Sequence, residues 1–152
     1  MNENLNEKAK NVLLFQAIEY KRTDLIKPLI RLGADPNMII TYNLLHCDQT
    51  YMPLLMYVFD QGNYAIAIEL IESGADVNAT DNCGDTILMY AACHYDESSI
   101  QIRNYLGQSD YDIFSTLINL GAKYDIESIQ NFFQNSGFNE IPFQVKKMLN
   151  FT

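Results

Sequence analysis

Histidine and cysteine, the residue types that most often bind metals or catalyse reactions, are scarce in this chain. The sequence contains two histidines and three cysteines, namely His46, Cys47, Cys83, Cys93 and His94. Folding could bring "HCD" at 46–48, "CH" at 93–94 and Cys83 together, which would gather ligands of the kind that zinc prefers. Structural zinc sites, however, usually place two ligands on either side of a short turn, whereas these ligands are adjacent in sequence. We therefore predict no metal and no cofactor. The odd number of cysteines, without the spacing of a disulfide framework, indicates reduced thiols.

Motifs of the common enzyme classes are also missing from the sequence. There is no GxSxG, no GxxxxGK followed by Ser or Thr, no HExxH and no GxGxxG. With two histidines, acid–base chemistry built on histidine has little to draw on. We expect a protein that is not an enzyme. The start "MNENLNEKAKNVLLFQ" lacks the basic region and long apolar centre of a secretory signal, so a cytoplasmic location is expected.

The negative charge is concentrated in the middle of the chain. The formal net charge is −9, but between Leu32 and Ala122 the single base Arg103 stands against twelve acids, giving 1 − 12 = −11. Binders of nucleic acids or anionic membranes need clustered Lys and Arg, so both partners are excluded. An acidic field favours a basic protein surface, although an acidic surface also serves solubility alone.

A Gly-Ala pair recurs along the sequence and divides it into similar segments. The pairs are Gly33-Ala34, Gly74-Ala75 and Gly121-Ala122, with spacings of 41 and 47 residues. Before each glycine lies an amphipathic segment such as "YAIAIELIES", with apolar residues three and four apart. Glycine then supplies the left-handed conformation that closes a helix. The periods indicate stacked supersecondary units.

The stretch "DNCGDTILMYAAC" at 81–93 predicts a turn followed by a helix. Asp81 and Gly84 are turn residues, and Thr86 can cap the helix that follows. Leu88, Ala91 and Ala92 then offer a narrow face for another helix. The same stretch resembles the ankyrin-repeat pattern DxxGxTPLHxAA and departs from it at Ile87 and Met89. The closing pattern with GADVN is complete at 70–78, nearly complete at 29–37 and degenerate at 117–125.

The resemblance to ankyrin repeats implies an all-α solenoid of about three repeats with a divergent C-terminal capping repeat. We expect one domain over 1–152, with repeats at about 11–37, 38–78 and 79–125 and the cap at about 126–152. The family unit of about 33 residues implies insertions, placed in loops at 38–52 and 94–110. The first insertion is apolar, so it either folds back onto the stack or forms part of a contact surface. In the cap, two helices are expected around Ser136-Gly137. Tyr57 and Tyr90 are expected in the core.

The family resemblance further implies a protein-binding module that uses turn tips and inner-helix ends. We expect an acidic concave face, flanked by aromatic insertions, that grips a basic protein. An inhibitor or immunity-type protein is one such function. The alternatives are a microbial effector or scaffold that engages a host protein, and a self-assembling structural protein, with a monomer favoured. Asn78 lies in a pattern that asparaginyl hydroxylases modify in the family, but an Asn there more often bonds its own backbone. The expected partner-binding residues are Glu19, Tyr20, Tyr42, Asp48, Tyr51, Asp60, Gln61, Asn82, Cys83, Asp85, Cys93, His94, Tyr95, Asp96 and Glu97.

Overall fold

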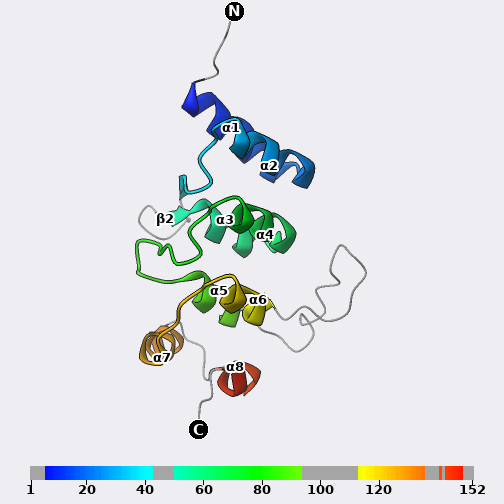
Figure 1. Ribbon diagram of the computed structural model, residues 1–152. Coiled ribbons are helices and arrows are strands. Elements are labelled where there is room, and N and C mark those ends of the chain that lie inside the picture. Colours follow the sequence, from blue (N-terminus) through cyan, green and yellow to red (C-terminus); the bar gives the residue numbers. More distant parts are fainter. Residues whose placement is uncertain (1–5, 43–49, 94–112, 136–140, 142, 149–152) are drawn as a thin grey trace, which may run out of the picture. The chain divides into compact units, whose positions relative to one another are not determined.

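The protein is built from short helices in pairs, seen in a computed structural model (Figure 1). The structure describes residues 6–42, 50–93, 113–135, 141 and 143–148. It divides into two units, Met1–Asp76 and Val77–Thr152, and each is described by itself. In the described part of the chain, no helix has the length and apolar character needed to cross a membrane.

The first unit holds two helix pairs. Helices α1 (Glu7–Glu19) and α2 (Thr23–Arg31) form the first pair, and α3 (Leu54–Asp60) and α4 (Tyr64–Glu72) form the second (Figure 1). The outer helices α2 and α4 pack against each other. The two pairs fall in the part of the chain where the first two helical repeats are expected, and α1 begins at Glu7, before the expected start at about residue 11.

The core of the first unit lies between the two helices of each pair. Leu14 and Ile26 are fully buried in the first pair, as are Leu54 and Leu70 in the second. Full burial of one such side chain stabilises the fold by about 1.5–3 kcal/mol. Phe59 is also buried and meets the ring of Tyr64 edge-on, with centroids 4.8 Å apart. Apolar burial inside each pair is therefore the main force that holds the two helices together.

Each predicted glycine turn closes a helix in the same way. Gly33, Gly74 and Gly121 have φ angles of 96°, 101° and 97°. In all three turns the following alanine donates its backbone N–H to a carbonyl five residues earlier, for example Ala75 to Leu70 at 2.9 Å. This bond satisfies a carbonyl that the last helical turn leaves without a partner.

Asparagine side chains join consecutive turns. The Asn37 amide donates to the Gly74 carbonyl at 3.2 Å, and its Oδ1 accepts from the Asp76 N–H at 2.7 Å. Within the second unit, the Asn78 side chain makes the same two bonds to the Gly121 carbonyl and the Lys123 N–H, at 3.1 and 2.7 Å. The expectation that Asn78 bonds its own backbone is therefore wrong. Its amide reaches a turn that lies more than forty residues further along the chain.

Asn11, which does not belong to a Gly-Ala turn segment, bonds the first glycine turn. The Asp35 N–H donates to Asn11 Oδ1 at 2.7 Å, and Asn11 lies inside α1. Asp35 stands two residues after its glycine, as Asp76 and Lys123 do after theirs. Asn11 thus fills the place that Asn37 and Asn78 fill for the later turns.

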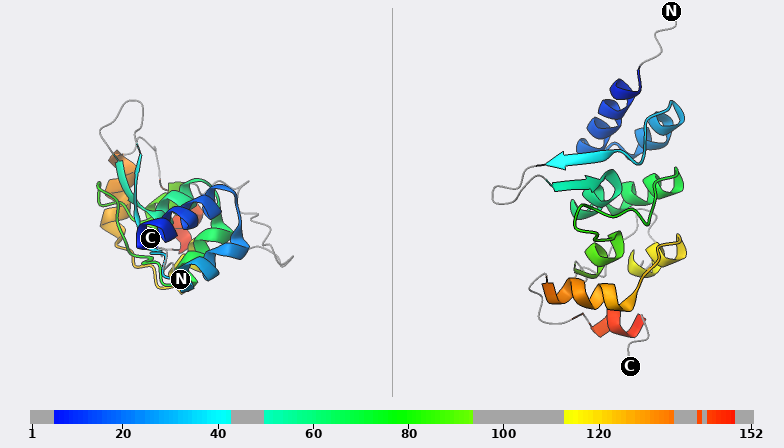
Figure 2. Two further views of the ribbon diagram at one scale, coloured as in Figure 1. Left: turned by 90° about the horizontal axis from the view of Figure 1, so that it is seen from above. Right: turned by 90° about the vertical axis from the view of Figure 1, so that its left-hand side faces the viewer.

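The first insertion contains a β-hairpin, which corrects the expectation of a loop. Strands β1 (Ile39–Tyr42) and β2 (Thr50–Pro53) pair antiparallel, with Ile39 opposite Pro53 and Thr41 opposite Tyr51. The hairpin projects from the side of the two helix pairs (Figure 2). Met52 on β2 is buried, whereas Ile39 and Tyr51 on the other face are 57% and 46% exposed. One hairpin face therefore packs on the unit and the other meets solvent.

The second unit begins with a turn, and the helices α5 to α8 follow in its described residues. A single bridge pairs Thr80 with Thr86. Helix α5 (Ile87–Cys93) then packs against α6 (Ile113–Asn119) and α7 (Ile126–Asn135), and α8 (Phe143–Met148) follows. The predicted face of Leu88, Ala91 and Ala92 is buried, and Thr86 Oγ1 accepts from the Met89 N–H at 3.4 Å, as expected of a helix cap. Among the described residues after 125, helices α7 and α8 lie where the divergent cap is expected, and the expected insertion at 94–110 lies outside the described residues.

Candidate functional site

The ends of α1 and α3 bring acidic and aromatic side chains to the surface of the first unit. Glu19 and Asp60 are the last residues of these two helices, and both are exposed. Tyr20 follows Glu19 and is 78% exposed, the most exposed large apolar or aromatic side chain in the described part of the chain. Gln61 is exposed after Asp60. An exposed tyrosine beside carboxylates suits contact with a cationic partner, since its ring face attracts cations.

Tyr57 fixes the position of the Glu19 carboxylate. The Tyr57 hydroxyl donates to Glu19 Oε1 at 2.9 Å. Its ring lies against Phe15, with centroids 5.6 Å apart. Tyr57 is half-buried. The expectation that it belongs to the core therefore holds for its ring, which packs against Phe15, but not for its hydroxyl, which bonds Glu19. Because Tyr57 is anchored by α3, the carboxylate of α1 is held in one place before any partner arrives.

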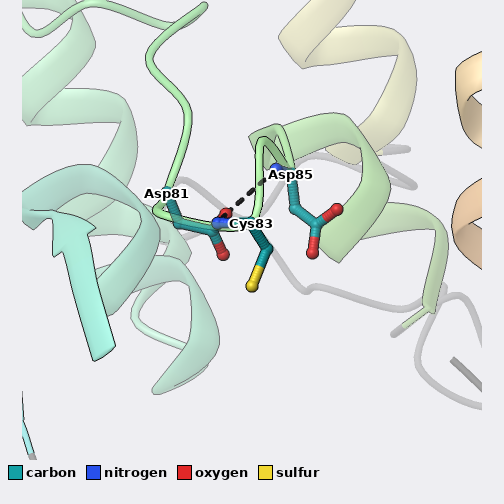
Figure 3. A group of neighbouring side chains, drawn as sticks. All are labelled: Asp81, Cys83 and Asp85. Carbon is teal, nitrogen blue, oxygen red and sulfur yellow. Dashed lines mark hydrogen bonds between the residues drawn. The ribbon is translucent and has the colours of Figure 1, made fainter. Parts of the chain in front are cut away.

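The turn of the second unit places Asp81, Cys83 and Asp85 together (Figure 3). Asp81 Oδ1 accepts from the backbone N–H of Cys83 at 2.8 Å and of Asp85 at 2.9 Å. The Tyr90 hydroxyl donates to Asp81 Oδ2 at 3.0 Å. Cys83 and Asn82 are exposed at the tip of this turn, and Asp85 is half-buried. The Asp81 carboxylate therefore shapes the turn that presents its neighbours.

The same three side chains form a group with the composition of a metal site. One ligand atom from each of Asp81, Cys83 and Asp85 lies within 4.8 Å of the others. Both carboxylate oxygens of Asp81, however, accept hydrogen bonds from protein donors. This engagement gives Asp81 a structural role in the turn. The sequence-based metal candidates at 46–48 and at His94 lie outside the described residues.

Asp85 carries its charge in an unfavourable setting. Partial burial raises the pKa of its carboxyl above the ordinary value, and the neighbouring Asp81 charge raises it further. Desolvation and a like charge both disfavour the ionised form. A charged Asp85 therefore lowers the stability of the folded turn at neutral pH.

The structure describes part of the expected binding set. It places Glu19, Tyr20, Asp60 and Gln61 at two helix ends of the first unit, and Asn82, Cys83 and Asp85 in one turn of the second. Tyr51 is exposed on the hairpin. Tyr42 and Cys93 lie on β1 and α5, but their side chains are not described. The remaining five lie outside the described residues: Asp48, His94, Tyr95, Asp96 and Glu97.

Sequence reasoning missed two tyrosine–carboxylate bonds that lie in the described part of the chain. Tyr57 and Tyr90 are each the fourth residue of an inner helix, α3 and α5, and both donate to an acid from another segment. The helical position was readable from the sequence. The acceptors were not, because Glu19 precedes Tyr57 by 38 residues and Asp81 precedes Tyr90 by 9.

Helix pairs closed by glycine turns and joined by asparagine side chains define a helical repeat protein. Residues 14–128 match a family model described as "Ankyrin repeats (3 copies)". This match covers more than half of the chain, and the protein belongs to the ankyrin-repeat family. A search of curated proteins finds no match to the chain. Ankyrin repeats are protein–protein interaction modules that in general do not catalyse reactions, so the chain is assigned to protein binding.

Proposed function

We propose that the protein binds a basic protein partner through acidic residues at its inner-helix ends and turn. The observation that supports this proposal most directly is the exposed group of Glu19, Tyr20 and Asp60 in the first unit. The Asp81–Asp85 turn of the second unit adds a further acidic surface.

Asp85 adds a physical argument for a binding role. Its burial and the nearby Asp81 make the charged form costly for folding. A cationic group brought by a partner would offset that repulsion, so binding would favour the ionised carboxylate. The proposal therefore predicts that association weakens in salt, because exposed charge pairs are screened.

The experiment is affinity capture from the lysate of the source organism at low and high salt. The test variant is Asp60→Asn with Asp85→Asn, which removes two proposed contact charges with little change in shape. The matched control is Glu7→Gln with Glu127→Gln, two exposed acids in the first turns of α1 and α7. Loss of a basic partner in the test variant and in salt, but not in the control, would support the proposal. Equal capture by all three proteins would reject the acidic surfaces as the interface.

The particular role that we propose is a cytoplasmic inhibitor, of the immunity type, of a basic toxin-like protein. This role rests on the acidic middle of the chain, in which twelve acids stand against one base between Leu32 and Ala122. Co-expression with the captured partner distinguishes it from a scaffold. An inhibitor rescues growth of cells that make the partner, and the Asp60→Asn, Asp85→Asn variant does not. Binding without rescue would instead favour a scaffold or effector.

A further inference from the structure

Helix α1 exposes an apolar face where the equivalent positions of the next repeat are buried. Adding the 41-residue spacing aligns Val12 with Pro53 and Leu13 with Leu54. Val12 and Leu13 are 49% and 39% exposed, whereas Pro53 is buried and Leu54 has no exposed surface. In the second repeat, the preceding repeat covers this apolar surface. The first repeat leaves the equivalent surface exposed.

The outer helix of the same pair extends this face. Leu25 of α2 is 37% exposed, and its equivalent in α4, Ile66, is 2% exposed. A shallow depression along α1 is lined by Asn6, Lys8, Ala9, Val12 and Leu13. We call the surface formed by Val12, Leu13 and Leu25 the N-terminal face.

Charged residues at the two ends of α1 border the N-terminal face, and they make the stripe of α1 that carries Val12 self-complementary. Lys8 and Glu19 are both exposed and stand eleven residues apart, which is about three helical turns and about 16 Å along the axis. They therefore lie on one stripe of the helix, with the positive charge near its start and the negative charge at its end. Val12 and the exposed Gln16 lie between them on the same stripe.

We propose that the N-terminal face binds a second copy of this chain, with the two α1 helices antiparallel. In this arrangement Lys8 of each copy meets Glu19 of the partner subunit, and the Val12 side chains lie near the two-fold axis. A two-fold contact uses the same patch on both copies, which an antiparallel stripe with opposite charges at its ends provides. Antiparallel helices also place opposite ends of their dipoles together.

The geometry of Glu19 is compatible with both of its contacts. Its Oε1 accepts from the Tyr57 hydroxyl at 2.9 Å. The second carboxylate oxygen can accept from the Lys8 ammonium of the partner subunit, since one carboxylate has about four acceptor positions. Tyr57 thus holds the carboxylate in place for the ion pair.

The size of the face sets the strength of the pairing. A helix of 13 residues is about 20 Å long, and two packed helices are about 20 Å across, so each copy buries about 400 Å². The total of about 800 Å² is below the roughly 1,200–2,000 Å² of stable complexes. The dimer is therefore weak, and it forms reversibly as protein concentration rises.

Analytical ultracentrifugation of the full chain over a series of concentrations tests this pairing. The wild type should shift from monomer to dimer as concentration rises. Val12→Arg should leave a monomer, while Ile126→Arg, at a similarly exposed apolar position on α7, should pair like the wild type. A wild type that stays monomeric up to the highest concentration would overturn the proposal, as would a dimer that Val12→Arg leaves intact.

A charge swap separates the ion pairs from damage to the fold. Lys8→Glu alone and Glu19→Lys alone each place like charges together twice, so the dimer should weaken about tenfold. The double variant Lys8→Glu, Glu19→Lys restores opposite charges and should return most of that affinity. A double variant as weak as the singles would refute the antiparallel arrangement. The Asp60→Asn, Asp85→Asn variant should dimerise normally, so loss of the foreign partner and loss of pairing can be told apart.

Discussion

Lys21 occupies a backbone conformation that usually requires glycine. Its φ of 54° lies in the left-handed region, and the aligned residue between α3 and α4 is Gly62, with a φ of 69°. Both residues donate their N–H to a carbonyl three residues earlier, at 2.9 Å. A side chain at Cβ makes this conformation less favourable. The first inter-helix turn therefore holds local strain that the second does not.

Replacing Lys21 with glycine should stabilise the protein by about 1 kcal/mol, because the left-handed conformation no longer meets a Cβ penalty. Urea unfolding followed by circular dichroism measures the change. The reciprocal variant Gly62→Ala should destabilise by a similar amount, since no atom lies within 4 Å of the added Cβ and the cost is conformational. A loss of stability in Lys21→Gly would contradict this reading of the turn.

Asp85 leads to a pH prediction with a definite sign. Its folded-state pKa is raised above the ordinary value of 3.8, by burial first and by Asp81 second. The folded protein therefore holds this proton more tightly than the unfolded chain does, and the penalty for the charged form is present at neutral pH. Asp85→Asn should raise the melting temperature at pH 7, and the gain should shrink as pH falls through the raised pKa. Asp60→Asn, at an exposed position, is the control, and a gain that grows in acid would contradict the prediction.

At the scale of elements, asparagine bridges connect one turn to the next. Asn37 and Asn78 each satisfy a carbonyl and an N–H of a later turn, which the glycine closures leave at the surface. Each bridge contains two hydrogen bonds, and removal of the side chain leaves both backbone groups to water. The bridges therefore add stability to the alignment of neighbouring turns in each unit.

Asn37→Ala should destabilise the first unit by about 1–2 kcal/mol, because a typical hydrogen bond contributes about 0.5–1.5 kcal/mol and two are lost. Asn37→Asp should lose less, since a carboxylate still accepts from the Asp76 N–H but meets the Gly74 carbonyl unfavourably. Urea unfolding gives both values. Asn119→Ala, at an exposed helical position, is the control and should change stability little. Equal stability of Asn37→Ala and the wild type would show that the bridge is energetically neutral.

The helix pairs were predictable from the sequence, and the hairpin was partly so. Gly-Ala spacing and amphipathic periodicity located the closing turns, because glycine at a positive φ leaves a local signal. The β-branched and aromatic residues of "IITY" and "TYMP" favour strands, but their pairing is set across residues 43–49. The role of Asn11 had no sequence signal, since Asn11 lies inside a helix and 24 residues before Asp35, the turn residue from whose N–H it accepts a hydrogen bond.

The surface exposure of several expected site residues was predictable from the sequence, but the contacts that organise them were not. Ankyrin-type spacing located Glu19, Asp60 and the 81–85 turn at surfaces. The contacts that organise them come from tyrosines expected in the core, because burial of a ring and bonding of its hydroxyl leave the same helical pattern. Lys21 could not be predicted either, since only the folded backbone reveals its left-handed conformation.

At the scale of the whole molecule, net charge opposes the compact state. The chain carries a formal charge of −9, and most of the excess acid lies between Leu32 and Ala122. Self-repulsion of like charges destabilises a folded protein and is screened by salt. The surface ion pairs of Lys27 with Glu69 and Glu72 act in the opposite sense, but exposed pairs contribute little.

Raising ionic strength should therefore raise the melting temperature at neutral pH. The screening length shortens from about 30 Å at 0.01 M salt to about 8 Å at 0.15 M, which removes most long-range repulsion. Calorimetry in sodium chloride at fixed pH measures the shift. Lys27→Gln should show a larger gain with salt, because it has one positive charge fewer and no ion pair to lose. A melting temperature that falls with salt would mean that the ion pairs outweigh the net charge.

The hydrogen bonds of the asparagine bridges go to backbone atoms of the next turn. Asn37 bonds the Gly74 carbonyl and the Asp76 N–H, and Asn78 makes the same bonds to Gly121 and Lys123, so an acid and a base are accepted alike. Because these bonds do not depend on the side chains of the next turn, the same asparagine bridge can connect any repeats whose turns have the same backbone geometry. Duplication or deletion of whole repeats could therefore lengthen or shorten such a chain without any change to the residues that connect neighbouring turns. The surface residues that select a partner would remain free to diverge at each added copy.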